Sequence, residues 1–166
     1  LIFIIPLVGL FGLLTNTFIV FVVSLSGNKE YLKAKQYSYM RIASLSNALV
    51  CFISMFTPIY QCQSFDGIFC SSVHHLVFTQ YFKIICVEFI SSVLKMISNF
   101  SYLGFLITRS SLIGKNHGKF IQIFSELSVV KFMFVSLLLS VIFSIVKIFR
   151  YQANTFDTDL DYPTPY

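Results

Sequence analysis

The side chains best placed to do chemistry lie in one apolar stretch near the middle of the chain. Polar residues recur there at intervals of three and four positions, namely Glu88, Ser91, Ser92, Lys95, Ser98, Asn99 and Tyr102. This spacing places all of them on one face of a helix. A stripe with an acid, a base and several hydroxyls could bind a polar ligand or line an ion path.

Glu88 and Lys95 are the two charges in this stripe, separated by seven positions. Two helical turns correspond to about 10–11 Å along the axis, which is too far for a direct salt bridge. Each charge therefore needs a partner from another helix, from water or from a ligand. We expect Glu88, Lys95, Ser91 and Ser92 to face a ligand, and the alternative is that they are structural charges inside a helix bundle.

No motif of a soluble enzyme accompanies the stripe. The sequence contains no glycine-rich phosphate loop, no His-Glu-x-x-His motif and no Cys-x-x-Cys pair. We therefore expect a protein that is not an enzyme and that uses neither a metal nor a cofactor.

The composition identifies the broad class of protein. Only 11% of the 166 residues are charged and 56% are hydrophobic, against about 25% and about 45–50% in soluble domains. These values exclude an ordinary water-soluble enzyme and a disordered chain, and they argue against nucleic-acid binding despite the net charge of +5. They predict an integral protein of the lipid bilayer.

Four apolar segments are long enough to cross a bilayer, which takes about 20 residues per helix. They cover residues 1–26, 37–60, 77–113 and 129–150, and an acidic segment, 151–166, follows. The predicted fold is an all-α, polytopic transmembrane bundle in which Pro58 kinks or ends the second helix. Rows of small residues favour close helix packing: Gly9, Gly12 and Asn16; Ala43, Asn47 and Ser54; Ser136, Ser140 and Ser144.

The positions of the basic residues predict the orientation. Eight of the twelve fall on one side of the membrane, namely Lys29, Lys33, Lys35, Arg41, Arg109, Lys115, Lys119 and Lys131. This side should be cytoplasmic, which places the N-terminus outside. On the outer side we expect Lys147 and Arg150 to extend away from the bilayer.

Three cysteines are disulfide candidates. Cys62 and Cys70 lie on the predicted outer, oxidising side, where a disulfide is permitted. They could pair with each other, one could pair with a cysteine outside this sequence, or both could be free. Cys86, near the outer end of the third segment, is the third candidate.

Three short motifs resemble those of a known receptor family. Thr15-Asn16-Thr17-Phe18-Ile19 is similar to Gly-Asn-x-x-Val, and Ile42-Ala43-Ser44-Leu45-Ser46-Asn47 is similar to Leu-Ala-x-x-Asp. Thr108-Arg109-Ser110 stands where Asp-Arg-Tyr would, with Ser98 eleven residues before the arginine. Together they resemble helices one to four of a rhodopsin-like (class A) G-protein-coupled receptor of the divergent invertebrate peptide-receptor type.

The resemblance implies a seven-helix receptor fold, of which this chain holds the N-terminal part. Such a receptor would sit in the plasma membrane, respond to an extracellular ligand, with a peptide as one candidate, and signal to a heterotrimeric G protein. The resemblance implies roles for three groups of residues: core polar positions Asn16, Asn47 and Ser98; coupling positions Thr108, Arg109 and Ser110; and ligand-facing positions that include Tyr60 with Glu88 and Lys95.

The chain also departs from the family pattern. Asn47 replaces an aspartate, Thr108 replaces the acid beside the arginine, and the chain contains no tryptophan. The family's disulfide cysteine would fall near Ile84, with Cys86 close by and Cys70 farther away.

Two other classes of protein are alternatives to the receptor. In a fragment of a transporter or channel, Glu88 and Lys95 would line the pathway. A broken helix interrupted by Gly or Pro, or an internal inverted repeat, would favour that class, and the sequence indicates neither. A four-helix scaffold of the tetraspanin or claudin type needs a large cysteine-rich outer loop, and the loop from Gln61 to Gln80 is too small for one.

Overall fold

A computed structural model describes residues 4–25, 35–60, 62–63, 69–70, 76–113, 127–149, 151–152 and 164–165. The first half contains α1 (Ile4–Leu25), α3 (Lys35–Ser54), α4 (Thr57–Tyr60), β1 (Cys62–Gln63) and β2 (Phe69–Cys70). The second half contains α5 (Val77–Phe82), the π-helix η2 (Lys83–Ile90), α6 (Ser91–Ile113), α8 (Val129–Phe149), β3 (Tyr151–Gln152) and β4 (Thr164–Pro165). The two strand pairs, β1 with β2 and β3 with β4, are antiparallel and two residues long.

Four helices among the described residues are long and apolar enough to cross a membrane. They cover Ile4–Leu25, Lys35–Tyr60, Val77–Ser111 and Val129–Ile148. Large apolar side chains are exposed along all four, as expected of helices whose solvent is lipid. The predicted all-helical architecture and the integral membrane class are therefore confirmed at this level.

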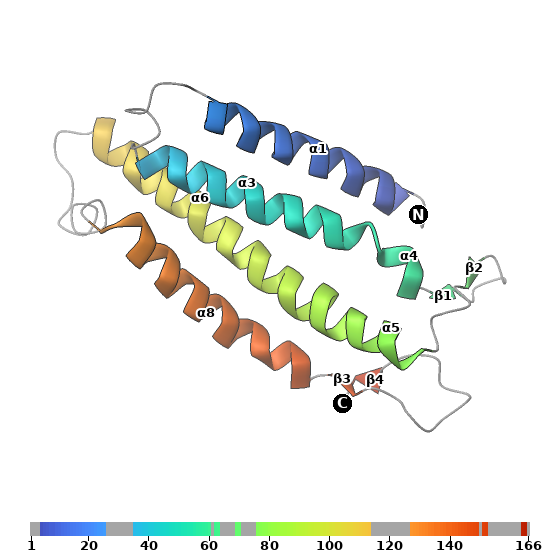
Figure 1. Ribbon diagram of the computed structural model, residues 1–166. Helices are drawn as coiled ribbons and strands as arrows, with labels where there is room; N and C mark the ends of the chain where they lie inside the picture. Colours follow the sequence, from blue (N-terminus) through green and yellow to red (C-terminus); the bar gives the residue numbers. More distant parts are fainter. Residues whose placement is uncertain are drawn as a thin grey trace.

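The four long helices run alternately up and down and lie side by side (Figure 1). α3 packs between α1 and α6, and α6 packs between α3 and α8. The start of α1, α4, the start of α5 and the end of α8 share one end of the bundle (Figure 1). At the other end, the Lys35 ammonium donates a hydrogen bond to the Leu127 carbonyl at 3.1 Å, which joins the start of α3 to the start of α8.

Small residues allow α1 and α3 to approach closely, as the sequence predicts. A Cβ added at Gly9 would lie 2.9 Å from the Ser54 Oγ, and one added at Gly12 would lie 2.6 Å from the Cys51 Sγ. Both distances are shorter than van der Waals contact, so a side chain at either position would require Ser54 or Cys51 to shift.

The serine row of α8 is also buried as predicted. Ser136, Ser140 and Ser144 are 3%, 0% and 1% exposed. The Ser136 and Ser140 hydroxyls donate to backbone carbonyls one turn earlier, at 2.9 and 2.6 Å, which satisfies them without partners from other helices. The row can therefore pack tightly against the centre of the bundle.

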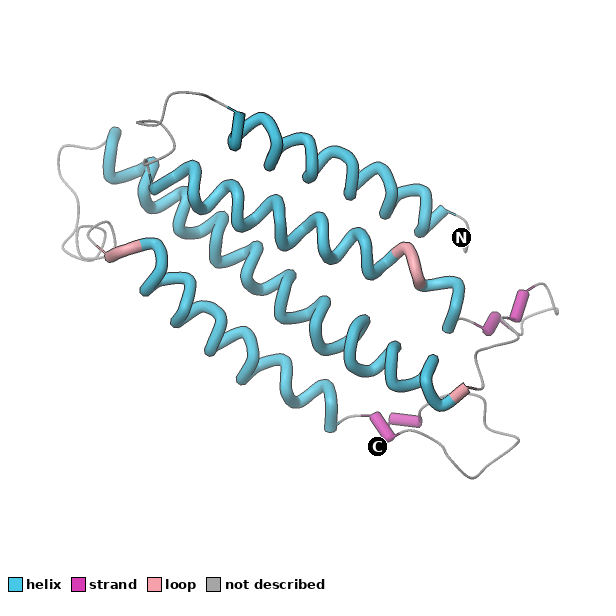
Figure 2. Tube along the Cα trace, in the orientation of Figure 1, coloured by secondary structure: helices cyan, strands magenta, loops and turns pink. Residues whose placement is uncertain are grey.

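The predicted disturbance at Pro58 is observed as a break between α3 and α4, shown as a loop segment in Figure 2. Proline cannot donate to the carbonyl four residues earlier, which here belongs to Ser54. The Thr57 hydroxyl donates to that carbonyl instead, at 2.6 Å. The break therefore occurs at Met55 and Phe56 with its exposed carbonyl satisfied.

The π-helix η2 was not predicted from the sequence. It interrupts the third spanning helix over Lys83–Ile90, and Glu88 lies inside it. π-helical turns are rare and occur often at functional sites. Since a π-helix has a wider turn than an α-helix, it changes the face presented by the residues before Ser91 relative to those after it.

The polar stripe predicted from the sequence is only partly buried. Ser98, which belongs to it, is 2% exposed, and Val93 and Ser101, which do not belong to it, are 8% and 0% exposed. Lys95, Asn99 and Tyr102, from the polar stripe, are exposed. The reason is that α3 and α8 pack on two sides of α6, and these three side chains lie only partly beneath them.

Candidate functional site

A cavity of about 260 Å³ lies where α3, α4, η2, α6 and α8 meet. Four of the five predicted ligand-facing residues line this cavity, together with Val87 of the same helix. The full lining is Val50, Ile53, Ser54, Thr57, Val87, Glu88, Ser91, Ser92, Lys95 and Lys147. The structure therefore brings Glu88, Ser91, Ser92 and Lys95 together in one cavity, towards the end of the bundle that holds α4 and the start of α1 (Figure 1).

The charges of the cavity come from three elements. Glu88 belongs to η2, Lys95 to α6 and Lys147 to α8. One carboxylate and two ammonium groups thus line the cavity, which leaves an excess of positive charge there. Because opposite charges attract, such a cavity favours a ligand that carries an acidic group.

Lys147 is the cavity residue that sequence reasoning missed. It was expected to extend outward from the membrane; it is exposed and it also lines the cavity. The available signal was its position three residues after Ser144, on the same face of α8.

The wall opposite η2 is formed by the break between α3 and α4. The Ser54 hydroxyl donates to the Cys51 carbonyl at 2.7 Å, and the Thr57 hydroxyl donates to the Ser54 carbonyl at 2.6 Å. Their protons are thereby directed to the backbone, so the oxygens can act only as acceptors towards the cavity. The two oxygens can therefore accept a hydrogen bond from a donor group of a ligand in this cavity.

Tyr60 lies one turn beyond this wall and does not line the cavity. Its hydroxyl donates to the Thr57 Oγ1 at 3.3 Å, and the Lys83 ammonium lies 5.9 Å from the centre of its ring. Phe56 and Phe82 also meet edge to face, with ring centres 6.1 Å apart. These contacts fasten α4 to the third helix above the cavity, so Tyr60 belongs to its rim.

The predicted coupling residues lie at the opposite end of the bundle. Arg109 is exposed near the end of α6. The Thr108 hydroxyl donates to the Gly104 carbonyl at 2.8 Å and the Ser110 hydroxyl donates to the Ile107 carbonyl at 2.9 Å. Both neighbours are therefore satisfied within the helix, and neither is held by Arg109.

The predicted core polar residues are not joined into one cluster. The Asn16 amide donates to the Gly12 carbonyl of its own helix at 2.8 Å. The Asn47 amide donates to the Tyr102 hydroxyl at 3.2 Å, which links α3 to α6. Ser98 is buried, with 2% of its surface exposed.

The structure brings the backbones of two of the three cysteine candidates together. Cys86 is a free thiol. The register of β1 and β2 places the backbone of Cys62 directly opposite that of Cys70, and the side chains of these two residues lie outside the described part. Among the described residues, no group of three His, Cys, Asp or Glu side chains could hold a metal ion.

Comparison of the chain with protein-family models, curated proteins and solved structures finds no match. The resemblance to a receptor family therefore rests on the short sequence motifs alone.

Proposed function

We propose that this chain is the ligand-binding half of a seven-helix, G-protein-coupled receptor and that the cavity between α3, η2, α6 and α8 receives an extracellular ligand. The observation that carries the proposal is the convergence of Glu88, Lys95 and Lys147 on one cavity. Ionisable residues inside a spanning helix are costly and are retained mainly for function. Three of them from three elements, sharing one cavity, support a recognition site better than a structural contact.

The open polar face of α6 supports the larger bundle. Lys95, Asn99 and Tyr102 are exposed on α6, although Lys95 also lines the cavity and the Tyr102 hydroxyl accepts from Asn47. Polar side chains at this depth must meet protein or a water-filled space. Further helices of a receptor packed on this face would supply both.

The charges of the cavity support a small acidic or zwitterionic ligand. An acidic group would bind the two lysines, while Glu88 would accept from an amino group of the same molecule. Its volume, about 260 Å³, is at the lower end of ligand pockets, which span roughly 300–1,000 Å³. An amino acid, a small carboxylate or the carboxyl end of a peptide matches these constraints.

The two ends of the bundle have separate roles in this proposal. The orientation expected from the basic loops puts the cavity on the outer side and Arg109 on the cytoplasmic side. A ligand that favours one arrangement of the helices would shift the population available to a G protein at the Arg109 end. Replacement of Arg109 by alanine should therefore weaken G-protein binding and leave ligand binding unchanged.

The test is a ligand screen by thermal unfolding of the chain in nanodiscs. The probes are single amino acids, small mono- and dicarboxylates and short peptides. We expect an acidic probe to stabilise the chain, by about 2.7 kcal/mol at a concentration one hundred times its Kd. The shift should vanish in Lys95→Gln and in Lys147→Gln, and it should persist in Lys131→Gln, which changes an exposed lysine at the far end of α8.

Three results would contradict the proposal. The first is that no acidic probe stabilises the chain, and the second is that Lys95→Gln responds as the wild type does. The third is that the stabilising probe is carried across the membrane of sealed vesicles that contain the chain, which would identify a transporter instead of a receptor.

A further inference from the structure

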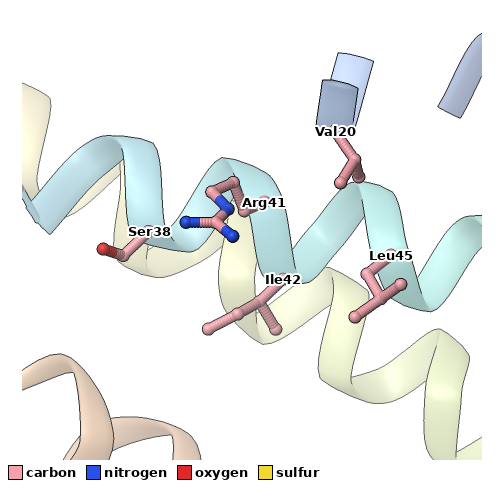
Figure 3. A pocket seen from close by; sticks show the side chains of 5 residues that line it. All are labelled: Val20, Ser38, Arg41, Ile42 and Leu45. Atoms are coloured by element: carbon pink, nitrogen blue, oxygen red, sulfur yellow. The ribbon is translucent and has the colours of Figure 1, made fainter. Parts of the chain in front are cut away.

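A second cavity, of about 240 Å³, lies between α1 and α3 at the end of the bundle away from the charged cavity. Its lining consists of Val20 from α1 and of Ser38, Arg41, Ile42 and Leu45 from α3. Figure 3 shows the Arg41 guanidinium extending along α3 on the side of Ser38, away from Leu45. One end of this cavity is therefore cationic and hydroxylated, and the other is apolar.

The guanidinium of Arg41 has no acidic partner among the described residues. The only carboxylate side chain in the described ranges is that of Glu88, which lines the other cavity. α1, which forms the facing wall, contains no charged residue at all. Arg41 is exposed, so its counter-ion can approach from the surroundings of the bundle.

The depth of Arg41 in a bilayer follows from helix geometry. The span Lys35–Tyr60 has 26 residues, which is about 39 Å at 1.5 Å per residue. If this span is centred on a hydrocarbon core of about 30 Å, the core begins about 5 Å inside Lys35. Arg41 lies about 9 Å along the helix and therefore about 4–5 Å below the core boundary, a distance that its side chain spans towards the interface.

We propose that this cavity binds an anionic phospholipid, with the phosphate at Arg41 and Ser38 and an acyl chain along Val20, Ile42 and Leu45. Arginine presents a planar fork of donors that matches a phosphate, and the Ser38 hydroxyl lies one turn from Arg41 on the same helix face. Basic cavities between spanning helices on the cytoplasmic side recognise lipid head groups in this manner. Diffuse attraction to a charged surface would instead act on every basic residue at this end.

The test compares lipids retained by the purified chain in native mass spectrometry, after equilibration with an equimolar mixture of phosphatidylglycerol and phosphatidylcholine. We expect the wild type to retain phosphatidylglycerol preferentially. Arg41→Gln should lower that preference about fivefold, the share of one basic residue in attraction to an anionic membrane. Lys131→Gln, which removes an exposed lysine at the same end of the bundle, should leave the preference unchanged.

A second pair of variants separates loss of the site from loss of folding. Val20→Phe fills the apolar end of the cavity and leaves Arg41 intact, so it should also reduce phosphatidylglycerol retention. Val22→Phe adds the same side chain at an exposed position of α1 and should not. Far-UV circular dichroism verifies that all four variants keep the helix content of the wild type.

Three results would overturn the proposal. Arg41→Gln could retain phosphatidylglycerol as the wild type does. Lys131→Gln could lose as much as Arg41→Gln, which would show diffuse charge attraction. Finally, inorganic phosphate or glycerol 3-phosphate could displace the lipid at equal concentration, which would show that the site takes free phosphate and not a lipid.

Discussion

Replacement of Gly104 by alanine tests the packing of α3 against α6, the pair that positions one side of the charged cavity. A Cβ at Gly104 would lie 2.8, 2.9 and 3.0 Å from three atoms of the Tyr39 ring. Carbon atoms pack at about 3.5–4.0 Å, so the ring would have to withdraw by roughly 0.7 Å. Tyr39 is 3% exposed and its ring meets that of Phe132 edge to face, with ring centres 5.5 Å apart. The ring therefore has little room to move.

Two opposing terms determine the size of the effect. Overpacking of a well-packed site costs about 1–3 kcal/mol, while a glycine-to-alanine change inside a helix contributes up to about 1 kcal/mol in favour. We expect Gly104→Ala to destabilise the chain by about 1–2 kcal/mol. In a Tyr39→Ala background the clash is absent, so the same change should stabilise the chain by up to about 1 kcal/mol.

The assay is the free energy of unfolding in mixed micelles, titrated with dodecyl sulfate and followed by far-UV circular dichroism. Ser110→Thr, which adds one carbon at an exposed position of the same helix, is the matched control and should change the free energy little. The sign reversal between the two backgrounds is the decisive observation. A clash between the added Cβ and the Tyr39 ring is refuted if Gly104→Ala is neutral or stabilising in the wild type. It is also refuted if Gly104→Ala still lowers the free energy of unfolding when Tyr39 is alanine.

Three further predictions concern packing, hydrogen bonding and orientation. Ser140→Leu adds bulk at a position that is 0% exposed and should lower the free energy of unfolding by about 1–3 kcal/mol in the same assay. Val146→Phe, on the exposed face of α8, should leave it unchanged. Equal effects of the two substitutions would contradict the buried serine row. Tyr102→Phe removes the hydroxyl that accepts from the Asn47 amide and should lower the free energy of unfolding by about 0.5–1.5 kcal/mol. Tyr81→Phe, at an exposed tyrosine, should not change it. If Tyr102→Phe lowers the free energy of unfolding equally in an Asn47→Ala background, the hydrogen bond does not contribute. A glycosylation sequence added before the first residue should be modified in microsomes if the N-terminus lies outside. If a glycosylation sequence inserted between α6 and α8 is modified instead, the orientation is the opposite of the expected one.

Much of the helix arrangement was predictable because it depends on local sequence. Lipid requires every backbone group in a span to be hydrogen-bonded internally, so long, predominantly apolar runs predict the helices directly. Pro58 predicts a break because its missing N–H affects a carbonyl at a fixed distance along the chain. The small residues of α1 and α8 predict close packing because they leave room for a neighbouring backbone.

The remaining features depend on neighbours that one helix does not encode. The π-helix around Glu88 has no sequence pattern of its own, and it became evident only from the backbone of η2. Lys147 joins the cavity because α8 packs against α6 and η2, and the same packing buries Val93. Four residues of the polar stripe line one cavity, but the pattern of the stripe could not say which of its members other helices cover.

The proposed ligand site requires that Lys95 and Lys147 line one cavity within the bundle. A short, membrane-permeant, amine-reactive cross-linker applied to the wild-type chain in nanodiscs, followed by peptide mass spectrometry, tests it without any substitution. We predict a cross-link between Lys95 and Lys147 and none between Lys95 and Lys131, which lies about 24 Å from Lys147 along α8. Single modification of both Lys95 and Lys147 without a link between them, or a link to Lys131 of equal yield, would contradict the shared cavity.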